Sequence, residues 1–406
     1  MKEGFPMRSR TPRTYHSKYR WVICFCATLL TFSVTGLASS AFSVWLPYIR
    51  QAHQFTATEV NLIVSCRTLA QIVGLLTVSG YFRRFRLRLG SALTAAGIGL
   101  GFILFGFAQS ALSYYAVAVG FGFFCAWALT ATGLAIGEWF TENKATALGI
   151  CATGTGIATI VSPAVIAALI RRFSLRTAFI FEGLFVLLVA GVVFLLFHEN
   201  PAAVSTAPQP TQSRQTGPLY ALDKRSVLLL TGGVFVIGIA AFGIPSGLPQ
   251  LFRDYYDENT SSALSAAFGV SLLAGKLLCG RLTDRLGLLR ANYIFFICLV
   301  VGGIGSFFAK QSLPLNVISL TLQGVGLSLS TVSVPVYANE LCAPGRYLDA
   351  LKHLNLAQTV GGLMITYVTG LLADATGNNS TLFLLVAVLT VFSTVMVQAV
   401  CRPKEK

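Results

Sequence analysis

The chain consists largely of long apolar stretches, and this feature limits its folds more than any other. A helix needs about 20 mostly apolar residues to cross the hydrocarbon core of a bilayer. Twelve stretches rich in Leu, Ala, Val and Gly meet that length, so we predict twelve membrane-spanning helices. They lie at roughly 21–48, 59–81, 91–109, 112–140, 146–170, 177–197, 226–250, 262–283, 291–309, 314–338, 353–373 and 381–400.

Composition supports a lipid environment rather than a large soluble core. Hydrophobic residues make up 54% of the 406 positions and charged residues only 11%. An average soluble domain carries about 25% charged residues. The stretches are continuous and lack the period-two alternation of a membrane β-barrel. The predicted fold class is therefore an all-α membrane protein with two pseudo-symmetric six-helix bundles.

A polar segment divides the predicted helices into two groups of six. Residues 198–225 are rich in Pro, Ser, Thr and Gln, which is typical of a flexible linker. The expected organisation is an N-terminal segment (1–20), a first bundle (21–197), the linker (198–225), a second bundle (226–400) and a tail (401–406).

The distribution of Lys and Arg predicts an orientation. The net charge is +15, and most basic residues lie in alternate connections, including 1–20, 82–90 and the linker. Cytoplasmic loops carry this excess, so we expect both termini in the cytoplasm. The protein should lie in the plasma membrane, which is the inner membrane if the source is bacterial. Basic residues confined to short loops also argue against a nucleic-acid partner.

Two loops at equivalent places of the two halves share a pattern. The loop after the eighth helix reads GRLTDRLG at 280–287, and the loop after the second reads GYFRRFRLRLG at 80–90. Both begin with a glycine and run into clustered arginines. Such an echo indicates a duplicated six-helix unit, which is an architecture of secondary transporters.

The later loop resembles the Gly-x-x-x-Asp-Arg-x-Gly signature of the major facilitator superfamily, with Gly280, Asp284, Arg285 and Gly287 at the matching positions. The earlier copy departs from it, because Arg84 stands where the Asp belongs. The resemblance implies that these positions control conformational change, since the Asp helps latch cytoplasmic helix ends in that family. Arg84 therefore calls the usual latch of the first half into question.

A narrower resemblance is to the monocarboxylate and oxalate/formate exchange branch of that superfamily. Residues 139–149 read WFTENKATALG and resemble its Trp-Phe…basic…Gly junction, with the usual basic pair reduced to Asn-Lys. Lys276 lies four residues before Gly280, where the branch carries a cation. Nitrate and nitrite carriers similarly place cations on helices 2 and 8, but their glycine-rich signature is not clearly present here.

Arg67 and Lys276 are cations inside apolar stretches that hold no nearby acid. A charge at bilayer depth costs about 2.5 to 3.5 kcal/mol on insertion scales, and such residues usually face a water-filled cavity. Both fall near the midplane of equivalent helices, where transporter sites lie. A guanidinium fork and an ammonium point charge suit a small anion. The structural alternative is that each cation bonds backbone carbonyls or Glu182.

Other polar residues complete the predicted substrate site. Gln71 lies one turn from Arg67 on the same face and would orient the guanidinium. Trp45, Asn355 and Gln358 would line the cavity. The alternative for Trp45 is an anchor at the membrane interface, where aromatic residues are common.

Glu182 is the acid that lies well inside an apolar stretch, and two roles are open to it. It would either couple transport to protons or pair with one of the outer-loop arginines, Arg171, Arg172 or Arg176. The sequence favours the pairing.

The sequence contains no catalytic constellation, metal-ligand spacing or cofactor motif, and its nine cysteines form no CxxC pair. We expect no enzyme, metal or cofactor but a monomeric secondary transporter in the bilayer. It would move a small anion, above all a carboxylate, by alternating access as a symporter or exchanger, with protons or a counter-anion as partner. An exporter of amphipathic compounds such as drugs or siderophores is the alternative, and a receptor that binds without transport is a third class.

Overall fold

The computed structural model describes residues 19–140, 142–198, 218–309, 312–343, 345–376 and 380–401. Most of the predicted N-terminal segment, linker and tail lie outside these ranges. The helices are α1 (Tyr19–Leu30), η1 (Thr31–Ser40), η2 (Phe42–Val44), α2 (Trp45–His53), α3 (Ala57–Phe107), α4 (Ala111–Trp139), α5 (Lys144–Arg172), α6 (Leu175–Leu196), α8 (Lys224–Tyr255), α9 (Glu258–Leu286), α10 (Leu288–Ala309), α11 (Leu313–Gly326), α12 (Leu329–Leu341), α13 (Tyr347–Thr376) and α14 (Thr381–Cys401).

Within the described ranges, ten helices are long and apolar enough to cross a membrane. One of them, α3, covers the two predicted spans 59–81 and 91–109. A kink at Arg86 separates these spans, since the backbone there leaves the helical conformation with φ 49° and ψ 167°. The helix α13 covers the predicted span 353–373. The prediction of an all-α membrane fold is confirmed.

One predicted boundary is wrong, and two predicted spans are irregular inside. The segment 82–90 is helical except at Arg86, since its arginines and leucines are good helix formers. The stretch 314–338 is broken between α11 and α12, where glycines and serines of low helix propensity lie. The stretch 21–48 passes through a π-helix, η1, before the 3₁₀ turn η2. Hydropathy located the spans 21–48 and 314–338 but carried no signal for the irregularities inside them or for the helical conformation of 82–90.

Side-chain caps begin several helices. Thr56 and Glu59 form a reciprocal capping box at the start of α3, and Ser174 accepts a bond from Thr177 N–H at the start of α6. Asp257 caps α9, and hydrogen bonds from Thr260 lower the pKa of its carboxyl. These bonds satisfy the free amides of each first turn.

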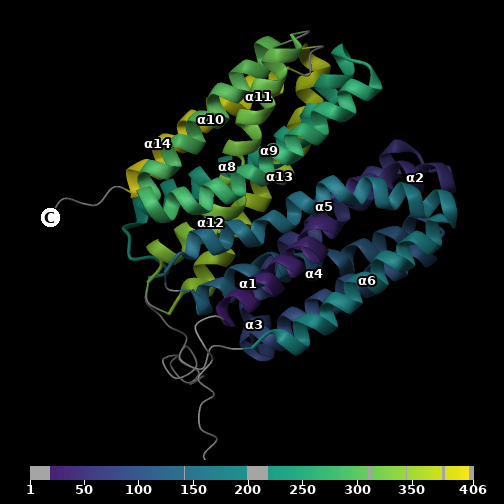
Figure 1. The fold of residues 1–406 in the computed structure, drawn as a ribbon, viewed down its shortest axis with the longest axis horizontal. Coiled ribbons are helices and arrows are strands. Elements are labelled where there is room, and N and C mark those ends of the chain that lie inside the picture. Colours follow the sequence, from purple (N-terminus) through teal and green to yellow (C-terminus); the bar gives the residue numbers. More distant parts are fainter. Residues whose placement is uncertain are drawn as a thin grey trace, which may run out of the picture.

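The helices form two groups, α1 to α6 and α8 to α14, and Figure 1 shows each group as a bundle of long, roughly aligned helices. We call the end where α6 finishes and α8 begins the linker end. The ribbons of the two bundles lie close together toward this end and diverge toward α2 and α11 (Figure 1).

The closest contact between the bundles is made by α5 and α9, which meet through glycines. A Cβ atom on Gly149 would collide with the carbonyl oxygen of Lys276, and one on Gly280 with that of Ala145. Small residues let two backbones approach in this way. The helix α13 also packs against α3 from across the bundles.

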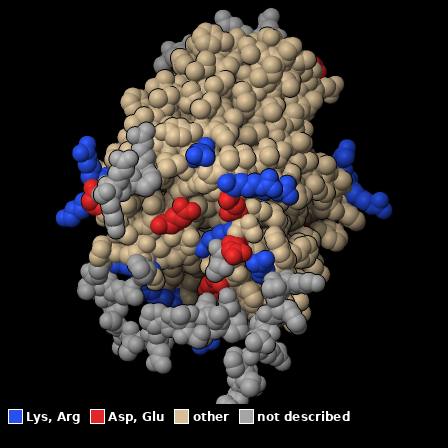
Figure 2. Space-filling model, turned by 60° about the vertical axis from the view of Figure 1, so that its left-hand side comes forward, with Lys and Arg blue, Asp and Glu red and all other residues tan. Residues whose placement is uncertain are grey.

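Charged side chains are unevenly distributed over the surface. In Figure 2 the Lys, Arg, Asp and Glu side chains in view lie mostly across the middle of the face and below it, while the upper part is almost entirely uncharged. Large apolar side chains such as Leu112, Leu188 and Val395 are at least 65% exposed. An apolar exterior of this kind matches a protein that has lipid as its solvent.

Candidate functional site

Lys276 lies on α9 and reaches across to the other bundle. Its side chain is 2% exposed. The ammonium donates to the carbonyl oxygen of Ala152 at 3.2 Å and to the hydroxyl of Thr155, both on α5. Among the described residues no carboxylate pairs with it. A positive charge of the C-terminal bundle is therefore held only by uncharged oxygens of the N-terminal bundle.

Arg67 lies on α3 and is 5% exposed. Its Nη1 donates to the carbonyl oxygen of Ala38 at 2.6 Å, and its guanidinium lies 5.3 Å from the ring centroid of Phe42. Its Nε is buried without a hydrogen-bond partner in the described structure. Ala38 belongs to η1, in which the amide of Ala41 bonds back to Gly36 in π-helical fashion. The π-helix is rare in proteins overall, but where it occurs it is often at a functional site.

The two cations lie on α3 and α9, and they donate to two neighbouring elements of the N-terminal bundle. Arg67 donates to η1 and Lys276 donates to α5. These two elements pack closely, because a Cβ on Gly36 would meet Ala158 and one on Gly154 would meet Phe32. In this conformation each cation makes the backbone contact that the structural alternative describes.

The remaining polar residues of the predicted site lie in different surroundings. Gln71 is 8% exposed on α3, one turn beyond Arg67. Asn355 on α13 is 3% exposed, and its Nδ2 has no partner in the described structure. Gln358 donates to the carbonyl oxygen of Ser330 at 3.0 Å, close to the break between α11 and α12.

Trp45 is fully buried in the core of the N-terminal bundle. Its ring stacks on Phe179 of α6 with centroids 3.8 Å apart and planes at 14°. It also lies beside Glu182, which is 8% exposed. Glu182 has no ion pair in the described structure, and Arg171, Arg172 and Arg176 are exposed at the surface.

The loop motif at 280–287 joins the two bundles at the linker end. Asp284 accepts hydrogen bonds from the amides of Ala145 and Thr146 at 3.1 and 2.7 Å. These are free amides of the first turn of α5, where the helix dipole also favours a negative charge. Gly287 ends α9 with φ 80°, a conformation that favours glycine. Arg285 is exposed.

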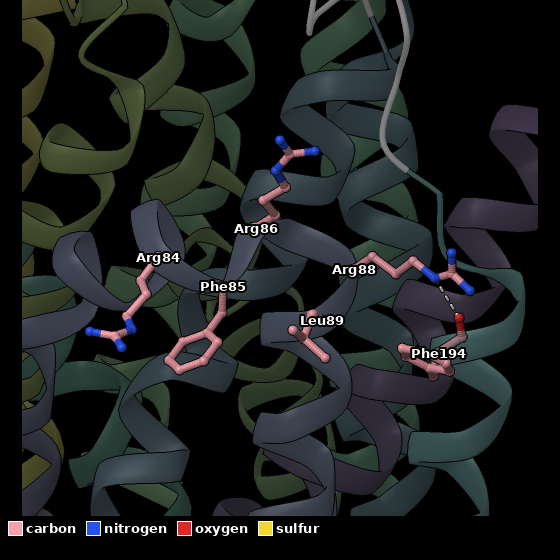
Figure 3. Close-up of a pocket in the computed structure, with 6 residues that line it drawn as sticks. All are labelled: Arg84, Phe85, Arg86, Arg88, Leu89 and Phe194. Carbon is pink, nitrogen blue, oxygen red and sulfur yellow. Dashed lines mark hydrogen bonds between the residues drawn. The ribbon is translucent and has the colours of Figure 1, made fainter. Parts of the chain in front are cut away.

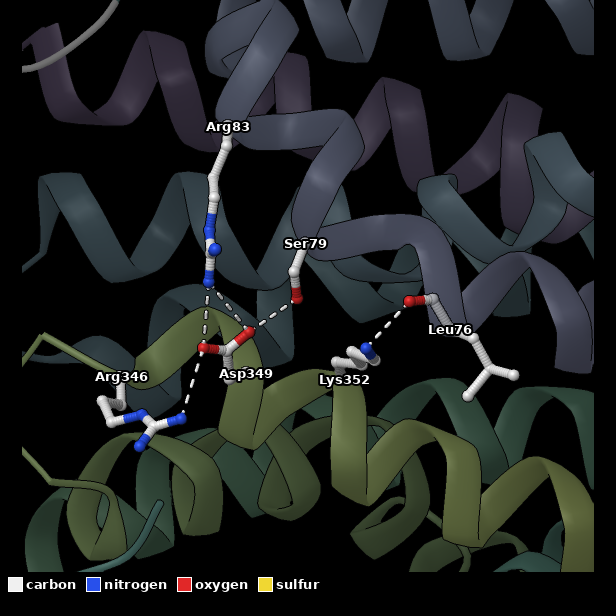
Figure 4. A network of polar contacts seen from close by, with 6 residues as sticks. All are labelled: Leu76, Ser79, Arg83, Arg346, Asp349 and Lys352. Atoms are coloured by element: carbon white, nitrogen blue, oxygen red, sulfur yellow. Dashed lines mark hydrogen bonds and ion pairs between the residues drawn. The ribbon is translucent and has the colours of Figure 1, made fainter. Parts of the chain in front are cut away.

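At the linker end the first half contacts the second through a basic residue of its own loop and an acid of the second half. Arg84 is exposed and lies over the ring of neighbouring Phe85 at 5.9 Å. Its neighbour Arg83 pairs instead with Asp349 of α13 at 3.2 Å, and Ser79 donates to the same carboxylate at 2.7 Å (Figure 4). The acid thus lies on α13 and the base on α3.

Sequence reasoning missed several contacts between the bundles at the linker end. Lys352 donates to the carbonyl oxygen of Leu76 at 2.8 Å, and Tyr347 donates to that of Gly133 at 3.0 Å. A usable signal was Asp349, an acid in the first turn of a helix. The acceptors of Lys352 and Tyr347 had no sequence signal, because a carbonyl oxygen is present at every residue.

A pocket of about 370 Å³ lies at the bend of α3. Six residues line it: Arg84, Phe85, Arg86, Arg88, Leu89 and Phe194. Arg88 donates to the carbonyl oxygen of Phe194 at 2.7 Å and lies 4.6 Å from the centroid of its ring. The three arginine side chains point in different directions in Figure 3, so they do not converge on one small anion.

Comparison with known proteins agrees with this architecture. The sequence model of the Major Facilitator Superfamily matches residues 28–312 and 230–406. The chain is 27% identical to monocarboxylate transporter 12 of Homo sapiens over 430 aligned positions, which cover 96% of this chain and 82% of that protein.

Solved structures share the fold at low sequence identity. The proton:xylose symporter XylE, bound to 6-bromo-6-deoxy-D-glucose, superposes with a TM-score of 0.78 at 14% identity, covering 94% of this chain and 95% of its own. The human organic anion transporter MFSD10 gives a TM-score of 0.71 at 13% identity, covering 95% and 100%. These relatives are transporters and not enzymes. With a family match that spans most of its length, the chain belongs to the Major Facilitator Superfamily.

Proposed function

We propose that the protein carries a small anion, above all a carboxylate, across the membrane by alternating access as a symporter or exchanger. One observation carries the proposal: Lys276 is a fully buried cation in a membrane-spanning helix, and no carboxylate among the described residues pairs with it. Charged residues inside membranes usually have a functional partner. An anionic substrate is the partner that would neutralise this charge.

The contacts of the two cations support binding by exchange of partners. The Lys276 ammonium has three donors, of which two reach Thr155 and Ala152. Arg67 keeps a buried Nε without a partner among the described residues. An anion would use the free donors and compete with the uncharged oxygens of η1 and α5. Since a carboxylate adds an opposite full charge that the neutral oxygens lack, it would be the preferred acceptor of these buried cations.

The relative named monocarboxylate transporter 12 supports the substrate class, because its sequence aligns along nearly the whole chain. The Lys- and Arg-rich connections support placing the linker end in the cytoplasm. With that orientation, the contacts of Asp284 and Asp349 close the cytoplasmic side. The conformation described here would then be the one closed to the cytoplasm.

Uptake into proteoliposomes tests the proposal. Wild-type protein should take up at least one member of a panel of formate, acetate, lactate, pyruvate and oxalate, and Lys276→Gln should abolish that uptake. Lys224→Gln, at an exposed lysine that begins α8, is the matched control and should transport normally. Unchanged uptake by Lys276→Gln would contradict the proposal. Transport of amphipathic compounds that survives the loss of both buried cations would favour an exporter.

A further inference from the structure

Glu182 is a buried carboxyl group in the membrane-spanning helix α6, and it lacks the partner that sequence reasoning favoured. It is 8% exposed, and neither carboxyl oxygen has a hydrogen-bond partner in the described structure. Arg176, on the same helix, instead lies over the ring of Phe107 at 4.1 Å. The carboxyl group is thus isolated from the arginines that would compensate its charge.

The elements packed against α6 supply no compensating charge either. These are α1, η1, α2, α3 and α5. Toward the end of α6 that holds Glu182, they carry Arg50 and His53 on α2, Glu59 and Arg67 on α3, and Arg171 and Arg172 on α5. His53 bonds Tyr114, Glu59 caps α3, and Arg67 bonds Ala38. Arg50, Arg171 and Arg172 are exposed.

The neighbour that acts on Glu182 is Trp45. The indole Nε1 of Trp45 is buried and also lacks a partner with hydrogen-bond geometry. Its ring is held in place by stacking on Phe179, one turn before Glu182 on α6. An N–H donor fixed beside a carboxyl group can serve it in both protonation states, because the carbonyl oxygen accepts in either.

Burial determines whether the Glu182 carboxyl group is ionised or protonated in this conformation. An ionised carboxylate without a cation in an apolar interior costs several kcal/mol, so the group takes up a proton instead. Inside a membrane such a residue is commonly part of a proton pathway. The neutral, protonated form of Glu182 therefore fits these surroundings, and a conformation that gave the group water or a cation would favour release of the proton.

A packed connection links Glu182 to the proposed anion site. Arg67 lies over Phe42, whose ring packs against Phe105 at 5.4 Å. Phe105 in turn lies 6.0 Å from Phe179, on which Trp45 stacks. Phe42 and Trp45 belong to the bent segment that continues from η1. Movement of this segment when Arg67 changes partner would alter the surroundings of Glu182.

We propose that Glu182 is the proton-binding site of the carrier, and that a proton bound there crosses the membrane together with the anion held at Arg67 and Lys276. The inference rests on the proposed transport function and specifies its coupling ion. On one side the carboxylate takes up one proton to become the neutral acid. On the other side it releases that proton, so that one proton and one monovalent anion cross without net charge.

Two transport modes in proteoliposomes test the proposal, with the carboxylate of the panel that wild type takes up best as probe. Counterflow at equal pH on both sides requires substrate binding and reorientation. Uptake driven by an alkaline interior also requires proton coupling. Glu182→Gln should retain counterflow and lose the several-fold stimulation by the pH gradient, whereas Lys276→Gln should lose both. Failure of the transport function and failure of the coupling role are therefore distinguishable.

Matched variants complete the test. Glu142→Gln alters an exposed acid between α4 and α5 and should keep full stimulation by the pH gradient. Trp45→Phe keeps an aromatic ring for Phe179 but removes the N–H, and it should shift the pH profile of uptake. Full stimulation in Glu182→Gln would overturn the proposal. If Glu182→Gln also loses counterflow, Glu182→Asp decides: restored stimulation supports proton binding, and equal inactivity of the two folded variants overturns it.

Discussion

Each buried cation donates to oxygens of the N-terminal bundle, and this arrangement sets what an anion must displace. Lys276 is held by the Thr155 hydroxyl and the Ala152 carbonyl, while Arg67 is held by the Ala38 carbonyl. These acceptors satisfy some of the donors without neutralising the charge. In the proposed carrier, these contacts would keep Lys276 and Arg67 ordered and leave their charge available to substrate.

Replacement of Thr155 tests this competition. Thr155→Val removes one acceptor of the Lys276 ammonium while keeping the shape of the side chain. A hydrogen bond to a charged group contributes about 1.5 to 3 kcal/mol, so the variant should bind the transported anion on the order of tenfold more tightly. The measurement is the KM for uptake, and Thr155→Ser, which keeps the hydroxyl, is the control. A KM that rises as in a loss of binding would contradict the competition.

The candidate residues differ in how far the sequence could identify them. Arg67 and Lys276 were evident, because a charge inside an apolar stretch stands out in any hydropathy pattern. Thr155 gave no signal, since threonine is common in membrane helices and its contact depends on how α5 meets α9. For Glu182 the sequence favoured pairing with an outer-loop arginine, whereas the structure buries the carboxyl group beside Trp45. That contact depends on how α6 packs against α2, which the sequence does not reveal.

At the scale of elements, two unlike contacts join the bundles at the linker end. Asp284 caps the first turn of α5, whereas Asp349 of α13 receives Arg83 and Ser79 from α3 (Figure 4). The acid of the first-half contact thus lies on α13 instead of in the loop at 80–90. This exchange gives a physical account of why an arginine is tolerated at position 84.

Asp349→Asn should loosen the contact between α3 and α13. The Arg83 side chain is 68% exposed, so the ion pair contributes only about 0.2 to 1 kcal/mol. The weakened bond from Ser79 adds about 0.5 to 1.5 kcal/mol. Together these losses should reduce the population closed at the linker end by on the order of tenfold. Pulsed EPR distances in nanodiscs report that population, with one label near the kink of α3 and one near the start of α13.

Two further variants make the result specific to the pair. Arg84→Gln should leave the distances unchanged, because Arg84 contacts the ring of its own neighbour Phe85. The double variant with Arg83→Asp and Asp349→Arg should restore part of the closed population. If Arg84→Gln opened the linker end as much as Asp349→Asn does, the contact would not depend on the pair of Arg83 and Asp349.

The elements themselves were largely predictable, and their irregularities were not. Continuous hydropathy locates a spanning helix because a bilayer requires about 20 apolar residues. It does not register the positive φ of Arg86, the π-helix η1 or the break between α11 and α12. Two of those features lie next to proposed site residues, Arg67 and Gln358.

For the whole molecule, the fold places Lys276 at the boundary between the two bundles, whereas Arg67 bonds within the N-terminal bundle. The contact of α5 with α9 joins the bundles through Gly149 and Gly280, and Lys276 donates across it. A rocking motion between bundles has to rearrange this contact. Substrate that takes Lys276 away from Thr155 would therefore favour that rearrangement, which couples binding to reorientation.

The central claim is that Lys276 binds an anion, and isothermal titration of purified protein tests it most directly. The wild type and Lys276→Gln would each be titrated with formate, acetate, lactate, pyruvate, oxalate, nitrate and phosphate. The account predicts that at least one carboxylate binds the wild type and binds Lys276→Gln about ten- to a hundredfold more weakly, as expected for the loss of a charged hydrogen bond. Equal affinity for the two proteins, or no binding of any anion to the wild type, would contradict it.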